Sequence, residues 1–271
     1  MLNENRDIKL IVVDLDNTIV KDGVNRISSR LKEDLHKARE KGIYVMLNTG
    51  RHYTFIYPSM FEDIPMEYIG TINGACLVKK DGTIIETHPM DEALMNQIIA
   101  FGNQYDLAIG FKFADAVVTY NQHDLFVKYY IAEGKQAEKL IINNDEKRDH
   151  HLEYGMPLGT FLIGEESIID QHLNDFPGVT ITYARNKSYD LFLNSINKTL
   201  TVDRVIKEYG LDWSQVIAFG DAGNDVPCIE KAGIGVMMGN AKEEIKQHGD
   251  YVAEACDQDG VAKMLEALQI V

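Results

Sequence analysis

Two aspartates separated by one residue stand directly after an apolar run near the start of the chain. Asp14 and Asp16 follow residues 10–13, Leu-Ile-Val-Val, and an apolar run of this length with β-branched residues predicts a buried strand. Two neighbouring carboxylates repel each other and lose hydration on burial, so their pairing indicates a cation or a reaction that uses them. Taken alone, this fragment leaves open an aspartate-rich turn that caps a helix.

Three further sets of polar residues occupy comparable positions. Residues 48–51 (Asn-Thr-Gly-Arg) follow a second predicted strand, Asp221 with Asn224 and Asp225 follows a later one, and Lys198 begins a helix. Ligands bind at the carboxyl ends of strands in an open α/β sheet, so we expect these sets to converge on one rim. Acidic oxygens there favour Mg²⁺ over zinc, and a hydroxyl, helix-start N–H groups and a lysine supply anion contacts. This is the equipment for phosphoryl transfer.

The elements that must position these residues alternate between strand and helix at both ends of the chain. Ser28 or Ser29 is a suitable N-cap, and Gly210 ends an amphipathic helix. Strands separated by helices of this length predict a parallel sheet with crossover helices. The predicted strands are 9–14, 43–47, 68–72, 215–219 and 233–238, and the predicted helices are 28–41, 200–209, 226–232, 242–248 and 261–268.

The middle of the chain has a different character. Lys80-Asp81-Gly82 is a strong turn signal for a hairpin over residues 78–86. A helix is predicted over 92–105, and aromatic and β-branched residues predict strands within 108–118 and 125–132. A block of strands and helices of this size predicts an α+β domain inserted into the first. We therefore expect a core made of residues 1–82 and 187–271, with residues 83–186 as the insertion.

Composition narrows the range of partners and compartments. The formal net charge of −15 argues against a nucleic-acid or membrane-surface partner, because phosphate-rich surfaces would be repelled. No signal peptide or membrane-spanning run is visible, and three cysteines without metal-ligand spacing indicate reduced thiols. These features predict a cytoplasmic protein, a monomer or homodimer, that acts on a small molecule.

Four motifs occur in order along the chain, each beside a predicted strand or helix start. They are Asp14-x-Asp16-x-Thr18, Thr49-Gly50-Arg51, Lys198, and Gly220-Asp221-x-x-Asn224-Asp225. In this order they resemble the motifs of the haloacid dehalogenase superfamily, and residues 237–241 and 259–262 are similar to its Cof-type phosphatase branch. The resemblance implies an α/β fold with a Rossmann-like parallel-sheet core and an inserted α+β cap of the C2B type.

The resemblance also implies chemical roles for the first motif. Asp14 looks like the nucleophile that forms an aspartyl-phosphate. Asp16 looks like the general acid that protonates the leaving group and then the base that activates water. Mg²⁺ would be held by Asp14, the backbone carbonyl of Asp16, and Asp221.

The remaining matched residues imply a phosphate site. Thr49 and the N–H groups of Gly50 and Leu15 would bind the phosphoryl group, with Lys198 offsetting charge and Asn224 contacting the phosphate. Three further residues would have supporting or specificity roles. Asp225 would orient Lys198 or a metal-bound water. Arg51 would contact either the substrate or solvent, and Asn73 is a further candidate for a specificity role. Two positions depart from the family pattern, Asn17 where glycine is commonest and Asn48 where alanine is usual.

These features together predict a Mg²⁺-dependent phosphatase of small phosphorylated metabolites, such as sugar phosphates. A phosphomutase-like phosphoryl transferase of the same superfamily is one alternative, and it would return the phosphoryl group to a sugar instead of water. A non-catalytic sensor of phosphorylated metabolites is another alternative, although every reacting group is present. The sequence does not identify the substrate.

Overall fold

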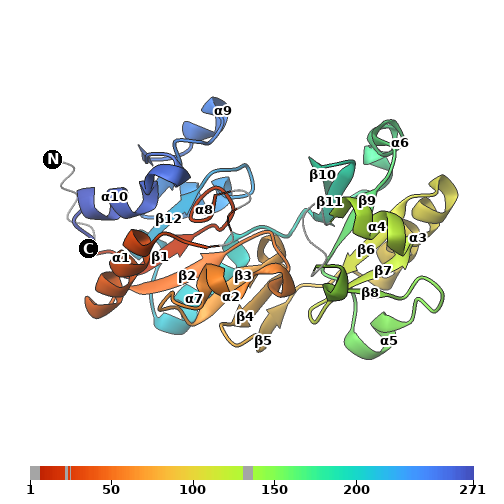
Figure 1. Cartoon of the computed structure of the whole chain (residues 1–271), viewed down its shortest axis with the longest axis horizontal. Coiled ribbons are helices and arrows are strands. Elements are labelled where there is room, and N and C mark those ends of the chain that lie inside the picture. The colour runs from red at the N-terminus through yellow and green to blue at the C-terminus, as the bar shows by residue number, and fades with distance from the viewer. Residues whose placement is uncertain (1–6, 22–23, 25, 131–136) are drawn as a thin grey trace. The chain divides into compact units, whose positions relative to one another are not determined.

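The computed structural model describes residues 7–21, 24, 26–130 and 137–271. The chain forms two compact units, which we call the core unit (residues 1–51, 56–85 and 197–271) and the inserted unit (residues 52–55 and 86–196). Figure 1 shows one sheet in each. Within the described part of the chain, no helix combines the length and the apolar composition that a membrane crossing requires.

The core unit is built on a mostly parallel sheet. Among the described residues, its strand order is β14-β13-β12-β1-β2-β3-β4-β5, and the pairs from β14 to β3 are parallel whereas β3 and β4 are antiparallel. The strands are β1 (Leu10–Val13), β2 (Tyr44–Asn48), β3 (Tyr68–Thr71), β4 (Cys76–Lys79), β5 (Ile84–Thr87), β12 (Val216–Gly220), β13 (Ile234–Met237) and β14 (Tyr251–Val252). Parallel strands end at the same rim, so the motifs that follow β1, β2, β3 and β12 are gathered there.

Strand β1 lies at the centre of this sheet because its residues are apolar on both faces. Leu10 and Val12 belong to a hydrophobic cluster with residues of α7 (Thr199–Tyr209) and α8 (Val226–Lys231) on one face. Ile11 and Val13 point to the other face and are also buried. The helices of the unit are α1 (Ser29–Glu40), α2 (Pro58–Phe61), α7 (Thr199–Tyr209), α8 (Val226–Lys231), α9 (Glu243–Lys246) and α10 (Gly260–Ala267).

Local signals in the sequence explain the helix ends. The Ser28 side chain accepts a hydrogen bond from the Leu31 N–H and caps α1, as predicted. Gly210 adopts φ +67° and ends α7, again as predicted. After Arg51 the chain forms only a 3-10 turn, Tyr53–Phe55, and the four residues of α2.

The inserted unit has a second, mostly antiparallel sheet. Its strand order is β10-β11-β9-β6-β7-β8 in the described residues, with only β7 and β8 pairing in parallel. The strands are β6 (Ala108–Lys112), β7 (Val117–Asn121), β8 (Ile141–Asn143), β9 (Gly159–Ile163), β10 (Val179–Arg185) and β11 (Ser188–Leu193); the helices are α3 (Glu92–Tyr105), α4 (His123–Tyr130), α5 (His150–Tyr154) and α6 (Glu166–Gln171). The predicted α/β class, with a parallel-sheet core and an added α+β part, is confirmed.

Two expectations for the inserted part differ from the structure. The strand predicted over 125–132 is instead helix α4, which ends at Tyr130; residues 131 and 132 lie outside the described part. Its Phe126 ring packs where a Cβ at Gly110 would stand, so tertiary packing outweighs the β-propensity of the segment. The unit also continues to Ile196 instead of ending at residue 186, because β11 pairs with β10 and β9.

Candidate functional site

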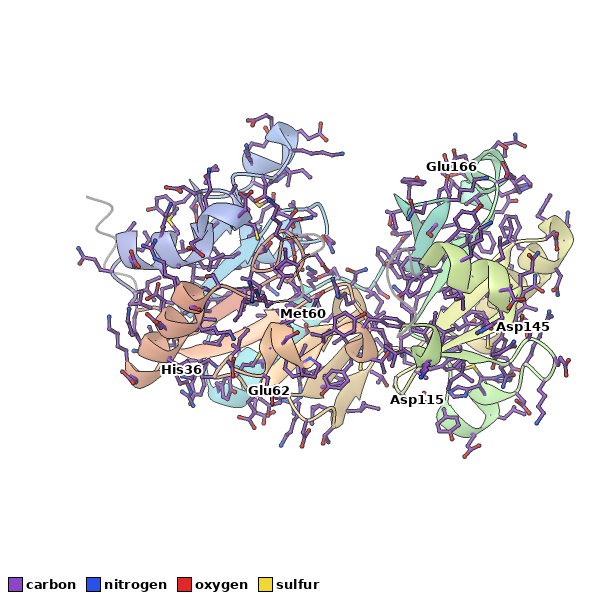
Figure 2. All side chains as sticks on the ribbon, viewed as in Figure 1. His36, Met60, Glu62, Asp115, Asp145 and Glu166 are labelled. Carbon is purple, nitrogen blue, oxygen red and sulfur yellow. The ribbon has the colours of Figure 1, made fainter. Side chains whose placement is uncertain are left out.

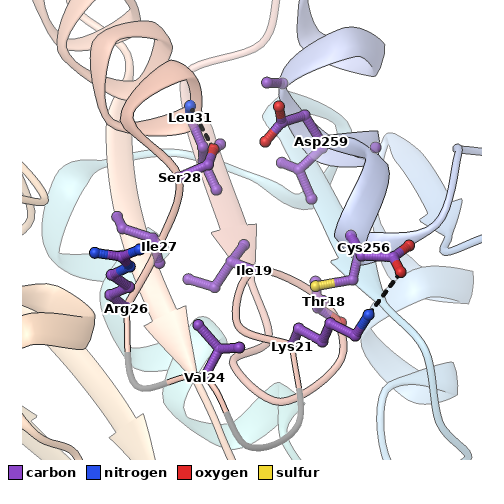
Figure 3. Close-up of a pocket in the computed structure, with 14 residues that line it drawn as sticks. Thr18, Ile19, Lys21, Val24, Arg26, Ile27, Ser28, Leu31, Cys256 and Asp259 are labelled. Carbon is purple, nitrogen blue, oxygen red and sulfur yellow. Dashed lines mark hydrogen bonds and ion pairs between the residues drawn. The ribbon is translucent and has the colours of Figure 1, made fainter.

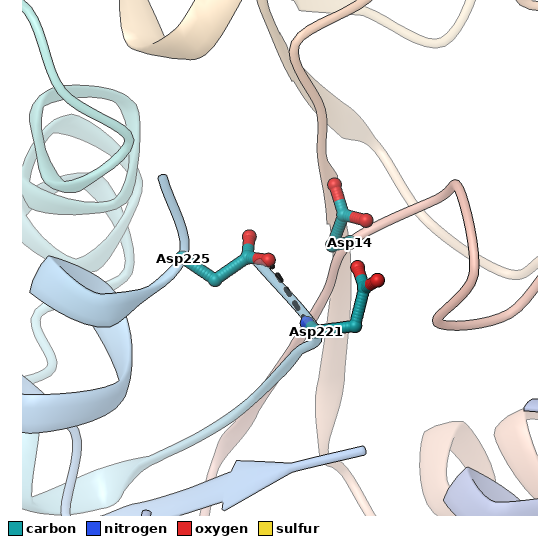
Figure 4. Close-up of side chains that lie close together, drawn as sticks. All are labelled: Asp14, Asp221 and Asp225. Carbon is teal, nitrogen blue, oxygen red and sulfur yellow. Dashed lines mark hydrogen bonds between the residues drawn. The ribbon is translucent and has the colours of Figure 1, made fainter. Parts of the chain in front are cut away.

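Three carboxylates converge at the carboxyl-terminal rim of the core sheet. Asp14 follows β1, and Asp221 and Asp225 follow the neighbouring strand β12. One oxygen from each lies within 4.8 Å of the others. Figure 4 shows the three side chains close together. Asp14 and Asp225 are buried and Asp221 is partly buried. Such a group of oxygen ligands suits a hard divalent cation.

A buried lysine completes this cluster. Lys198 precedes α7, and its side chain is only 2% exposed. Its Nζ donates to Asp14 Oδ1 at 2.5 Å and to Asp225 Oδ1 at 2.6 Å. An ammonium shared by two carboxylates is one of the few ways to bury it without a large loss of solvation energy. The geometry therefore brings Lys198, predicted from a separate motif, directly onto Asp14.

The loop after β12 is folded around Asp225. The Asp225 Oδ2 atom accepts hydrogen bonds from the N–H groups of Asp221 and Ala222, each at 3.0 Å. A Cβ at Gly220 would overlap the Asp225 side chain, which explains the glycine at this position. Thr18 Oγ1 donates to Asp221 Oδ1 at 3.4 Å and ties the first motif to this loop.

The ionisation of the cluster follows from burial and from crowding of like charges. Burial raises the pKa of Asp14 to about 8 against the opposing effect of Lys198, and Asp225 adds to the rise. Burial also raises the pKa of Asp221 to about 6, again with a contribution from Asp225. Burial lowers the pKa of Lys198, but Asp14 and Asp225 outweigh it, so the net shift is upward. A cation would relieve this crowding of negative charge.

The carboxylate of Asp16 lies outside the group formed by Asp14, Asp221 and Asp225 and is paired with Arg51. Arg51 Nε donates to Asp16 Oδ2 at 2.8 Å and Arg51 Nη2 donates to Asp16 Oδ1 at 2.5 Å, which is bidentate geometry. The Asp16 side chain is 41% exposed. Arg51 Nη1 also contacts Met60 Sδ at 3.7 Å. Met60 belongs to α2 and is labelled in Figure 2. Arg51, which the motif left open to solvent or substrate, thus contacts Asp16.

The turns after β2 and β3 are bonded to each other. Thr49 is buried, and its Oγ1 accepts from the Arg51 N–H at 3.2 Å. The Asn73 N–H donates to the Thr49 carbonyl at 3.2 Å, and a Cβ at Gly50 would stand 2.8 Å from Asn73 Oδ1. Asn224 Nδ2 donates to the same Asn73 oxygen at 3.0 Å. Asn73 thereby joins two of the predicted motifs, the one that contains Thr49 and the one that contains Asn224.

Backbone strain is concentrated in the same turn. Ile72, Asn73 and Gly74 all have positive φ, at 51°, 55° and 97°. For the β-branched Ile72 this is a rare conformation, and a hydrogen bond from its N–H to the Arg51 carbonyl helps to hold it. Strained residues of this kind concentrate at functional sites. Asn17 also has positive φ, 58°, which explains why it can replace the glycine that is commonest there.

A pocket of about 310 Å³ lies beside the loop that follows β1 (Figure 3). Lys21 and Asp257, both in its lining, form an ion pair at 2.8 Å. Its described lining includes none of the predicted site residues, and Thr18 is its link to Asp221. The pocket is therefore a neighbour of the carboxylate cluster and not its centre.

The structure brings most of the predicted site residues to one rim of the core unit. Leu15 is fully buried. Sequence reasoning underestimated Asp225, whose oxygen lies in the acidic group while the Asp16 carboxylate does not. It also assigned no role to Asn48, which is buried and bonded to Lys198. The signals for Asn48 were its place in the polar set at residues 48–51 and its departure from the usual alanine.

Known proteins resemble this chain over nearly its whole length. It is 25% identical over 264 residues to the 5-amino-6-(5-phospho-D-ribitylamino)uracil phosphatase of Bacillus subtilis, covering 97% of this chain and 96% of that protein. A phosphatase of the haloalkanoate superfamily from Bacteroides thetaiotaomicron has a similar structure, with a TM-score of 0.83, 22% identity, and coverage of 97% and 96%. A haloacid dehalogenase-like hydrolase from the same organism has a TM-score of 0.80, 26% identity, and coverage of 96% and 99%.

The family model described as haloacid dehalogenase-like hydrolase matches residues 11–265. This range contains all four motifs and the whole inserted unit. The resemblance drawn from the motifs is therefore confirmed, together with the enzyme class that it implied. The chain belongs to the family of haloacid dehalogenase-like hydrolases.

Proposed function

We propose that the protein is a Mg²⁺-dependent phosphatase that hydrolyses small phosphorylated metabolites, such as sugar phosphates, through an aspartyl-phosphate on Asp14. The observation that carries the proposal is the buried cluster in which Lys198 bonds to Asp14 and Asp225 beside Asp221. This cluster offers a nucleophile, a charge-compensating cation and metal ligands at one point. The B. subtilis relative, a phosphatase of a phosphorylated metabolite, supports the same reaction class.

The donor set fits magnesium. When ionised, the three carboxylates beside one ammonium carry a net charge of −2, which a divalent cation would neutralise. Asp14 and Asp221 would hold Mg²⁺ through side-chain oxygens and Asp16 through its backbone carbonyl, and Mg²⁺ prefers such oxygen ligands. When bound, Mg²⁺ would withdraw charge from the phosphoryl oxygens.

Asp14 performs the first bond change in this proposal. One of its carboxylate oxygens forms a bond to phosphorus, and the bond from phosphorus to the ester oxygen breaks. Lys198 holds Asp14 Oδ1 at 2.5 Å and so limits rotation of the nucleophile. The N–H groups of Leu15 and Gly50 and the side chains of Thr49 and Asn224 orient the phosphoryl group.

Asp16 moves the protons. Its carboxyl group donates a proton to the leaving alkoxide and, as a carboxylate, then takes one from the water that attacks the aspartyl-phosphate. That second attack releases inorganic phosphate and restores Asp14. In the geometry described here both Asp16 oxygens accept from Arg51, so Asp16 must leave this pair to act as a proton donor.

A panel of phosphorylated metabolites tests the proposal. The purified protein is assayed for phosphate release with Mg²⁺, after exhaustive EDTA treatment, and after Mg²⁺ is restored. We expect release from a subset of the panel, its loss on chelation and its return with the metal. Phosphate release from no member of the panel, or full activity after chelation, would contradict the proposed function.

A further inference from the structure

Asn48 is a buried polar residue at the carboxyl end of β2 that neither the metal site nor the phosphate site uses. It is 1% exposed, and it directly precedes Thr49. A buried amide must satisfy its hydrogen bonds within the protein, so its partners show what this side chain holds in place.

Both ends of the Asn48 amide bond to the start of α7. Its Nδ2 donates to the Lys198 carbonyl at 2.8 Å, and its Oδ1 accepts from Thr201 Oγ1 at 3.2 Å. The Thr201 hydroxyl also lies 3.2 Å from the Lys198 carbonyl. The backbone of Lys198 is therefore fixed by a side chain from a strand that is far away in the sequence.

The neighbouring strand β3 leaves space for the Asn48 side chain. Asn48 pairs with Gly70 in the register of β2 and β3. A Cβ at Gly70 would overlap both Asn48 Oδ1 and Thr201 Oγ1. Because Gly70 has no side chain, there is space for the Asn48 amide. Strand β2, strand β3 and the start of α7 thus all contribute to the bond from Asn48 to the Lys198 carbonyl.

The other end of Lys198 lies in the carboxylate cluster. Its ammonium bonds to Asp14 and Asp225, and a cavity of about 10 Å³ is lined by these three residues together with Asn48. Such a small cavity leaves little space for Lys198 to take a second position once its backbone is held. Misplacement of a catalytic group by about 1 Å can cost about 10²-fold in rate.

We propose that Asn48 is a positioning residue for Lys198 and, through Lys198, for the Asp14 carboxylate. The inference rests on the proposed function, because it assigns Lys198 to the phosphoryl-transfer site. Asn48 acts without touching the substrate, so its loss is expected to lower kcat more than it changes KM.

The test compares Asn48→Ala with a matched amide in the inserted unit. Asn121 Nδ2 donates to the Leu107 carbonyl at the same 2.8 Å, and Asn121 Oδ1 accepts from Arg148 Nη2 at 3.3 Å. With p-nitrophenyl phosphate as substrate, we expect Asn48→Ala to lower kcat by about 10²-fold and Asn121→Ala to leave it within a factor of about two. Thr201→Val, which removes the hydroxyl that donates to Asn48 Oδ1, is expected to give a smaller fall in kcat and serves if Asn48→Ala does not fold.

A double-mutant cycle separates positioning from general destabilisation. In a Lys198→Met background, the further change Asn48→Ala should leave the residual kcat within a factor of about two, because the residue through which it acts is gone. Equal losses in both backgrounds, or an unchanged kcat in Asn48→Ala and Thr201→Val, would overturn the inference. An inactive wild-type protein on every phosphomonoester would instead overturn the proposed function, so the two failures are distinguishable.

Discussion

At the scale of single residues, the two aspartates of the first motif have different surroundings despite being two positions apart. Asp14 is buried against Lys198, whereas Asp16 is partly exposed and paired with Arg51. A buried, oriented carboxylate suits a nucleophile, and an accessible one suits proton exchange with water and the leaving group. The structure thus gives a physical reason for assigning the two roles in this order.

Substitution of these aspartates should separate the roles. Asp14→Asn removes the nucleophile and is expected to abolish turnover, while Asp16→Asn should lower kcat by about 10²–10⁴-fold. Steady-state phosphate release measures both effects, with circular dichroism to establish that each variant is folded. Asp257→Asn is the control, since Asp257 pairs with Lys21 outside the cluster and is expected to keep wild-type kcat. Substantial turnover by a folded Asp14→Asn would contradict the assignment.

At the scale of elements, the core could be predicted because its signals are local. The apolar run of β1, the Ser28 cap and Gly210 act within a few residues of the elements that they define. Parallel strands end at one rim, so the positions of the motifs after predicted strands indicated that they would converge there. The pairing of Asp16 with Arg51 and of Asn48 with Lys198 could not be predicted, because it depends on side-chain packing between distant segments.

Helix α4 illustrates the same limit in the inserted unit. Its aromatic and β-branched residues favour a strand, but Phe126 packs over Gly110. The Asp145 carboxylate (Figure 2) also accepts from the His123 N–H at 2.7 Å, from 22 residues further along the chain. Neither Gly110 nor Asp145 lies within the segment, so no local sequence pattern could predict these contacts.

Removal of that acceptor should loosen α4. Asp145→Ala is expected to destabilise the helix start by about 1 kcal/mol, the usual cost of a lost N-terminal cap. Hydrogen exchange followed by mass spectrometry should show faster exchange in peptides that cover residues 123–130. The exposed neighbour Glu146 provides the control, and Glu146→Ala should leave this exchange unchanged. Equal protection in Asp145→Ala and the wild type would show that packing alone holds the helix.

At the scale of the whole molecule, the net negative charge of the chain makes positive charges at the site important for binding an anionic substrate. The chain carries 42 acidic and 27 basic side chains, so an anionic substrate meets an unfavourable overall field. Lys198 and Arg51 supply positive charge at the rim, and a bound cation would add to it. Stability and metal binding should therefore be linked through the ionisation of the carboxylates in this cluster.

This linkage predicts a pH-dependent stabilisation by Mg²⁺. The folded-state pKa values of Asp14 (about 8) and Asp221 (about 6) exceed their ordinary value of 3.8. Without metal, the folded state thus binds more protons than the unfolded state between pH 4 and 8. The contribution of these two groups to the free energy of unfolding therefore falls as pH rises. Bound Mg²⁺ favours the ionised carboxylates, so we expect it to raise Tm more at pH 8 than at pH 6.

Differential scanning fluorimetry with EDTA or saturating Mg²⁺ measures this difference. At a Mg²⁺ concentration of about 100 times Kd, the stabilisation should be about 2.7 kcal/mol. Asp221→Asn removes one ligand and is expected to reduce the Mg²⁺-dependent shift in Tm at pH 8. A shift of the same size at both pH values, or none in the wild type, would argue against a metal held by these carboxylates.

The most direct test of the central claim is to trap the phosphorylated enzyme. The wild type and Asp16→Asn are mixed with a substrate and Mg²⁺, quenched during turnover and treated with borohydride, which reduces an aspartyl-phosphate to homoserine. Peptide mass spectrometry should find homoserine at position 14 in samples with Mg²⁺ and none in samples without Mg²⁺. Homoserine at another aspartate, or its absence from both enzymes during demonstrated turnover, would contradict nucleophilic catalysis by Asp14.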